Sequence, residues 1–228
     1  MRLHFLSLIS CFFLVTQTVA QEIEKVKVPF KDPLPWFSIR GSCTIPKITG
    51  SEAFRISFLG VYDANLTVHF RLGKMFTIGV GYQSVLFNQS AFFKYKGLDT
   101  RLNVSNGIVK IGIDKPVGPK SFVTLSATSG FGINQYTAVK AAKDSLNGKY
   151  PTYFNATFLR PEVSYNFLVE DNFAFGVLIA YNMILASYDP KLNCFDTYEN
   201  FGKYKNKANM GWISFGFNFY YGPKKKKA

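Results

Sequence analysis

The sequence of 228 residues is poor in the residues on which several protein classes depend. Three cysteines are too few to hold a chain of this length together as a disulfide scaffold. Of the two histidines, His4 lies in the first twenty residues and only His69 follows, so a His-rich zinc site is excluded. Beyond the first twenty residues no run of about eighteen apolar residues occurs, and no transmembrane helix is expected.

Acidic residues and chemical motifs are also scarce. The chain has 14 Asp and Glu against 27 Lys and Arg, a formal net charge of +13. It has no P-loop, Gly-rich dinucleotide fingerprint, nucleophile elbow or Cys-x-x-Cys, so no cofactor is expected. What it does have is aromatic side chains, 24 Phe and 13 Tyr, which favour half-buried strands. The composition therefore indicates an all-β fold.

The first twenty residues have the pattern of a secretory signal peptide. Arg2 supplies a positive start, residues 6–15 form an apolar stretch, and Thr18-Val19-Ala20 precedes the expected cleavage point before Gln21. An alternative is a lipobox at Leu8-Ile9-Ser10-Cys11, although only seven residues precede it, too few for an apolar stretch. Because exported chains meet an oxidising compartment, cysteines of the mature chain can form disulfides.

From Trp36 onward, apolar residues recur at every second position, which is the period of a strand and not of a helix. In strand four the apolar positions change parity, which predicts a β-bulge near Asn106-Gly107. The eight expected strands cover about 36–46, 61–72, 75–87, 101–115, 121–136, 153–168, 172–187 and 209–221.

The connections between these strands alternate in length. Those at 73–74, 116–120 and 169–171 are short, whereas those at 47–60, 88–100, 137–152 and 188–208 are long. This layout is typical of a closed antiparallel up-and-down β-barrel with tight turns at one end and long loops at the other. The predicted domains are a signal peptide at 1–20, an N-terminal periplasmic extension at 21–34, a barrel at 35–222 and a basic tail at 223–228.

The polar face of the strands decides whether the barrel is soluble or transmembrane. A solvated outer face should carry many Lys and Glu residues, but only Lys110 and Glu162 occur there, among Gly, Ser, Thr, Ala and Asn. Small polar side chains suit the lumen of an eight-stranded barrel. The apolar face should then point outward into lipid, with Phe and Tyr at its borders.

Several motifs resemble the outer-membrane β-barrel family common in Bacteroidota, and the size is similar to that of OmpX and OmpA barrels. They are the signal ending at Ala20-Gln21, the start of strand one at Trp36-Phe37-Ser38-Ile39-Arg40-Gly41, the repeat Gly79-Val80-Gly81-Tyr82, and the last strand. The resemblance implies the cell outer membrane as location and insertion by the outer-membrane assembly machinery. That machinery would read the alternating residues Ile213, Phe215, Phe217, Phe219 and Tyr221, although a basic tail follows Tyr221 here.

The charged residues of the predicted lumen are the candidate functional site. Unpaired charges in a narrow lumen would be desolvated without compensation, so we expect ion pairs, with Glu162 within about 4 Å of a cation. The pairs form either a plug that closes the barrel or a gate that admits ions, and we favour the plug. The predicted network consists of Arg40, Asp63, Arg71, Lys110, Asp114, Arg160 and Glu162.

These features favour a non-enzymatic protein with a structural or surface-interaction role and at most weak conductance. The alternatives are a lipid-modifying barrel enzyme, which would need His69 near a lipid-exposed rim, and an accessory barrel of a secretion system. Basic loop residues suit phosphates of lipopolysaccharide, and nucleic acid is not an expected partner. Closure of the barrel also allows a disulfide between Cys43 and Cys194, although Cys43 shares the parity of the lipid-facing residues.

Overall fold

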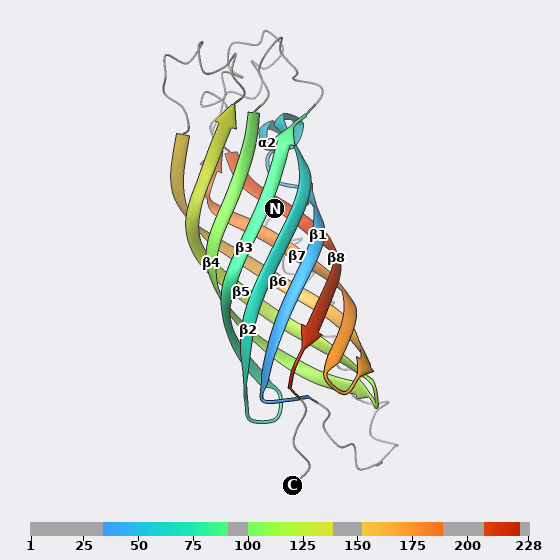
Figure 1. Cartoon of the computed structure of the whole chain (residues 1–228). Helices are drawn as coiled ribbons and strands as arrows, with labels where there is room; N and C mark the ends of the chain where they lie inside the picture. The colour runs from blue at the N-terminus through green and yellow to red at the C-terminus, as the bar shows by residue number, and fades with distance from the viewer. Residues whose placement is uncertain (1–33, 91–99, 139–151, 189–207, 224–228) are drawn as a thin grey trace, which may run out of the picture. The chain divides into compact units, whose positions relative to one another are not determined.

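The computed structural model describes residues 34–90, 100–138, 152–188 and 208–223. The expected signal peptide, most of the N-terminal extension, Cys194 and most of the basic tail lie outside these ranges. Eight strands and one short helix make up the described part (Figure 1). Their bounds are β1 Phe37–Ile48, α2 Glu52–Ser57, β2 Phe58–Leu72, β3 Phe76–Gln89, β4 Thr100–Gly118, β5 Ser121–Ala138, β6 Thr152–Glu170, β7 Phe173–Tyr188 and β8 Ala208–Tyr221.

The eight strands form a closed barrel in which each strand pairs with the next and β8 returns to β1. Every pairing is antiparallel, including the closing one, in which Cys43 lies opposite Phe217. The sheet therefore closes on itself, and no sheet edge remains exposed along the barrel. The prediction of a closed up-and-down barrel of eight strands is confirmed.

We call the two ends of the barrel the turn end and the loop end. The turn end holds the short connections β2–β3, β4–β5 and β6–β7, including Gly73 with its positive φ of 70°. The loop end holds the other connections. Segment 47–60 was predicted to be a loop, but the structure places α2 there, with the Ser51 hydroxyl accepting a bond from the backbone N–H of Phe54. No helix in the described ranges is long and apolar enough to cross a membrane.

The outer wall of the barrel is apolar and exposed. Side chains alternate between wall and lumen, so that Phe215, Phe217 and Phe219 of β8 point outward while Ser214 is fully buried. β7 repeats the pattern, with Phe175, Val177, Ile179 and Tyr181 exposed. The assignment of the apolar face to the exterior is confirmed for both strands.

The lumen is divided into layers. Charged and polar side chains fill its middle, whereas an apolar cluster closes the loop end, formed by α2 residues such as Phe54 and strand residues such as Phe87, Tyr188 and Trp212. A smaller cluster of Leu34, Phe122, Leu168, Ala174 and Tyr220 fills the turn end. The small polar residues expected in the lumen therefore line its middle, and apolar side chains take their place at its two ends.

The predicted bulge at Asn106-Gly107 is also wrong. β4 pairs without interruption through these residues with both β3 and β5. Leu102 and Val104, whose parity is opposite to that of Val109 and Ile111, are buried in the lumen, in the same parity as Lys110. The apparent change of parity has a simple cause: the loop-end cluster makes the inward face of β4 apolar as well.

Candidate functional site

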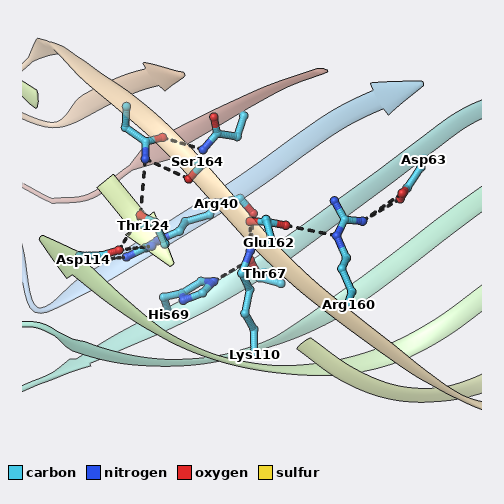
Figure 2. Close-up of polar contacts among 12 residues, drawn as sticks. Arg40, Asp63, Thr67, His69, Lys110, Asp114, Thr124, Arg160, Glu162 and Ser164 are labelled. Atoms are coloured by element: carbon cyan, nitrogen blue, oxygen red, sulfur yellow. Dashed lines mark hydrogen bonds and ion pairs between the residues drawn. The ribbon is translucent and has the colours of Figure 1, made fainter. Parts of the chain in front are cut away.

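Four charged side chains from three strands form a continuous chain across the lumen (Figure 2). Lys110 Nζ of β4 donates to Glu162 Oε1 of β6 at 2.5 Å. Arg160 Nε lies 3.2 Å from Glu162 Oε2, and Arg160 Nη1 reaches both carboxylate oxygens of Asp63 on β2 at 3.0 Å. Arg160 therefore bridges two carboxylates that come from different strands.

The Asp63 carboxylate is fully buried and is surrounded by donors. Besides Arg160, it accepts bonds from Gln83 Nε2 at 3.0 Å, Ser214 Oγ at 2.5 Å and Trp212 Nε1 at 3.4 Å. These groups come from β3, β6 and β8, so one side chain of β2 is bonded to three other strands. A buried carboxylate with this many donors has its lone pairs satisfied without water.

A further ion pair, separate from this chain of four charges, lies closer to the turn end. Arg40 of β1 holds Asp114 of β4 in a bidentate pair, with Nη1–Oδ1 at 3.0 Å and Nη2–Oδ2 at 2.5 Å. The Thr124 hydroxyl donates to Asp114 Oδ1 at 2.7 Å, and the Arg40 guanidinium lies 5.0 Å from the ring centre of Tyr220. Planar two-point pairing of this kind is geometrically specific as well as strong.

Six of the seven predicted network residues therefore form ion pairs, three cations with three carboxylates. The expected contact between Glu162 and a cation is confirmed by Lys110 and Arg160. The seventh, Arg71, donates to the backbone carbonyl of Leu34 at 3.1 Å, near the end of β2. Arg71 thus fastens the segment that precedes β1 and takes no part in the pairs described above.

Little space remains around these charges. A cavity of about 20 Å³ lies beside Arg40, Lys110 and Glu162, with Tyr220 and Phe122 on its turn-end side. That volume holds about one water molecule. Above and below it the apolar clusters fill the lumen, so the site resembles a sealed polar layer more than a ligand pocket.

His69 is buried in the lumen and does not lie on a lipid-exposed rim. Its Nε2 is 2.9 Å from the Thr67 hydroxyl, and its ring packs over Gly79 on β3. The catalytic alternative required the opposite placement, and the geometry does not support it. Across the described residues, no group of three or more His, Cys, Asp or Glu side chains is arranged to hold a metal ion.

Sequence reasoning did not identify the neutral partners of the charges. Gln83, Asn182 and Ser214 have the inward parity of their strands, but parity does not give the position of a side chain along the barrel axis, and that position decides which groups it can reach. Asn182 Nδ2 donates to Ser214 Oγ at 2.9 Å, and Asn106 Nδ2 donates to Gln83 Oε1 at 3.2 Å. Asn106 was obscured by the bulge predicted at its position.

The described members of the two remaining sets of candidate residues, the β8 series and Cys43, lie on the outer wall. In β8, Phe215, Phe217, Phe219 and Tyr221 are exposed and Ile213 is partly exposed, as the alternation requires. Cys43 is a free thiol that also faces outward. Because Cys194 lies outside the described residues, the Cys43–Cys194 bond stays a prediction, and the outward position of Cys43 argues against it.

No protein-family model matches the chain, and no curated protein is significantly similar to it. Among solved structures, the chain is similar to Neisserial surface protein A, with 11% identity, a TM-score of 0.48, and coverage of 82% of this chain and 97% of that one. It is also similar to Ail, the attachment invasion locus protein of Yersinia pestis (9% identity, TM-score 0.42, coverage 81% and 97%), and to the outer membrane protein OprG from Pseudomonas aeruginosa (11%, 0.43, 82% and 96%). Likenesses this distant leave the role of the chain to be argued from its own residues.

Proposed function

We propose that this chain is an outer-membrane β-barrel with a closed lumen, which serves as a structural or surface-interaction protein and not as a pore or an enzyme. The observation that carries the proposal is the complete pairing of six lumen charges between two apolar clusters. A conducting lumen needs a hydrated path, whereas here ion pairs and aromatic rings occupy the interior.

The outer wall supports a membrane location. Exposed Phe, Tyr, Val, Leu and Ile side chains cover it, and a soluble barrel would present such a surface to water at high cost. Exposed charged residues of the strands lie near strand ends, as Lys47, Arg101, Lys115 and Glu170 do. An uncharged middle between charged borders is what a lipid bilayer requires of a barrel.

The loop end would then face the cell exterior, as it does in barrels of this design, and the turn end the periplasm. The long connections at that end are rich in lysine, including Lys140, Lys143 and Lys149, and the described residues add Arg55 and Arg101. Such a rim suits the phosphates of lipopolysaccharide, with about 1 kcal/mol per basic side chain. The outward aromatic series of β8, ending at Tyr221, is the proposed signal for the assembly machinery.

Cell fractionation tests the location. The protein should be recovered in the outer-membrane fraction and should migrate faster on a gel without boiling than after boiling, because the closed barrel survives detergent. Recovery as a soluble periplasmic monomer would overturn the proposal.

Single-channel recording in planar bilayers tests the closed lumen. The wild-type protein should give no regular conductance steps, and Glu162→Ala should destabilise the barrel without opening it, because the two apolar clusters remain. The matched control is Glu170→Ala, which removes an exposed carboxylate at the end of the same strand. Conductance steps that Glu162→Ala enlarges and Glu170→Ala leaves unchanged would instead identify the network as a gate.

A further inference from the structure

The apolar cluster at the turn end of the lumen includes one residue that lies outside the strands. Four of its members come from the wall: Phe122 of β5, Leu168 of β6, Ala174 of β7 and Tyr220 of β8. The fifth, Leu34, precedes β1, yet only 1% of it is exposed. Figure 1 shows the start of β1 at this end of the barrel. We call residues 34–35 the entry segment.

The entry segment crosses the mouth of the barrel from one wall to the other. The Leu34 carbonyl accepts a bond from Arg71 of β2, whereas the Leu34 side chain packs against residues of β5 to β8. In a closed barrel of eight strands in sequence order, β2 and β6 lie on opposite sides. Phe122 and Tyr220 also line the small cavity of the polar layer, so the cluster that holds Leu34 separates that layer from the mouth.

Gly222, the residue after β8, is fitted to the entry segment. A Cβ at Gly222 would collide with Cγ of Pro35, so a residue without a side chain is needed for the proline ring to pack here. The Gly222 N–H donates to the Asn172 carbonyl at 2.9 Å, which fixes the backbone against which Pro35 rests. Because proline restricts its own φ and the conformation of the preceding residue, this contact also limits the directions that Leu34 can take.

The entry segment can leave the lumen without unpairing the barrel. The pairing of β1 with β2 begins at Phe37 and that with β8 at Ile39, so neither includes Leu34 or Pro35. We propose that the entry segment is a stopper, which seals the periplasmic mouth of the lumen and, when it withdraws, admits water and small solutes to the polar layer from that side. The inference rests on the closed lumen and the orientation proposed above.

Thiol labelling of Ser38→Cys tests the stopper. Ser38 is buried on the lumen side of β1, and its hydroxyl accepts a bond from Arg40 Nε at 3.2 Å. The mature chain carries this substitution together with Cys43→Ala and Cys194→Ala, and is refolded in detergent. Methyl methanethiosulfonate, a small neutral thiol reagent, should react with the introduced thiol far more slowly in the folded barrel than in urea.

Two further substitutions should open the mouth. Leu34→Ala should speed labelling at least about tenfold, because loss of a buried leucine favours the withdrawn segment. Gly222→Ala should act in the same direction, since its Cβ displaces Pro35 without removing a lumen side chain. Two controls should leave the rate unchanged: Leu125→Ala removes an exposed leucine of the outer wall, and Phe54→Ala removes a ring at the loop end.

Each other result has a distinct meaning. If the thiol of the Ser38→Cys barrel reacts as fast when folded as in urea, the closed lumen of the proposed function is overturned. If it is protected there and equally protected after Leu34→Ala and Gly222→Ala, the stopper alone is overturned. Equal acceleration by Phe54→Ala would also overturn the stopper, because access would not depend on the turn end. Faster migration of the unboiled protein shows that each variant is folded, and if Leu34→Ala does not fold, Gly222→Ala decides.

Discussion

The middle and the loop end of the lumen are both closed, but by different physical means. In the middle, Arg160 is hydrogen-bonded to Asp63 at 3.0 Å and ion-paired with Glu162 at 3.2 Å. At the loop end, aromatic rings such as Phe54, Phe87 and Trp212 pack with centroids 5.2 to 5.6 Å apart. The first layer depends on charge balance, and the second depends on volume.

This difference decides which substitutions each layer tolerates. Removal of one member of a buried ion pair leaves a charge without compensation, whereas removal of a complete pair is often nearly neutral. Loss of a packed aromatic ring cannot be compensated in this way, because the deleted ring leaves a cavity whichever residues surround it.

The largest effect is expected from Asp63→Ala. The substitution leaves Arg160, Gln83 and Ser214 without their shared acceptor and should lower the free energy of unfolding by roughly 3–5 kcal/mol. Urea unfolding of the refolded barrel in lipid vesicles measures this loss. A change below about 1 kcal/mol would show that water or other groups replace the carboxylate easily.

Phe87→Ala should cost about 3 kcal/mol, at the low end for a buried phenylalanine, because the short helix α2 can move into the space. The same unfolding experiment measures it. Because the two layers are stabilised by different means, substitution of charged residues should not restore the free energy of unfolding that Phe87→Ala loses. If neutralising Lys110 and Glu162 in the Phe87→Ala variant restored that stability, the two layers would not be independent.

Lys110→Met combined with Glu162→Leu should leave stability within about 1–2 kcal/mol of the wild type. Arg160 loses its contact with Glu162 but keeps its two bonds to Asp63, and the two apolar side chains replace one cation and one carboxylate. Each single variant should be clearly less stable than the double variant. Additive single effects would show that Lys110 and Glu162 do not act as a pair.

The smallest effect is expected from Glu52→Gln on α2. Its carboxylate lies 3.8 Å from Arg55, and both side chains are more than half exposed. An exposed pair one turn apart contributes at most about 0.5 kcal/mol. If Glu52→Gln lowered the free energy of unfolding as much as Asp63→Ala does, burial would not explain why the lumen ion pairs stabilise the barrel more than this exposed pair.

Strand alternation made the wall and the inward charges predictable. Arg160 and Glu162 are two residues apart on one strand, so a single parity assignment placed both inside, and the narrow lumen then required a cation near Glu162. Arg71 shows the limit of this reasoning. It has the right parity, but it lies near the end of β2, where it donates to the backbone carbonyl of Leu34.

The loop-end cluster could not be separated from a bulge by pattern alone. Leu102, Val104 and Ile108 point inward while Val109 and Ile111 point outward, so apolar residues occupy both parities of β4. A strand with an apolar lumen face and a strand with a bulge both show apolar residues in both parities, so the sequence pattern does not distinguish them. The helix α2 did leave a signal, a Ser51 cap followed by Glu52 in the first turn, but six residues are too few for a helical period to stand out.

The bonds of Asp63 also have a consequence for the order of assembly. Two of its donors, Trp212 and Ser214, belong to β8, the last strand to be made, and Ser214 is 151 residues away along the chain. Until β8 meets β1, this carboxylate lacks part of its shell and must keep water around it. Dehydration of the lumen and closure of the seam are therefore one cooperative event, and a barrel open at β1–β8 should be a high-energy, sparsely populated intermediate on the folding pathway.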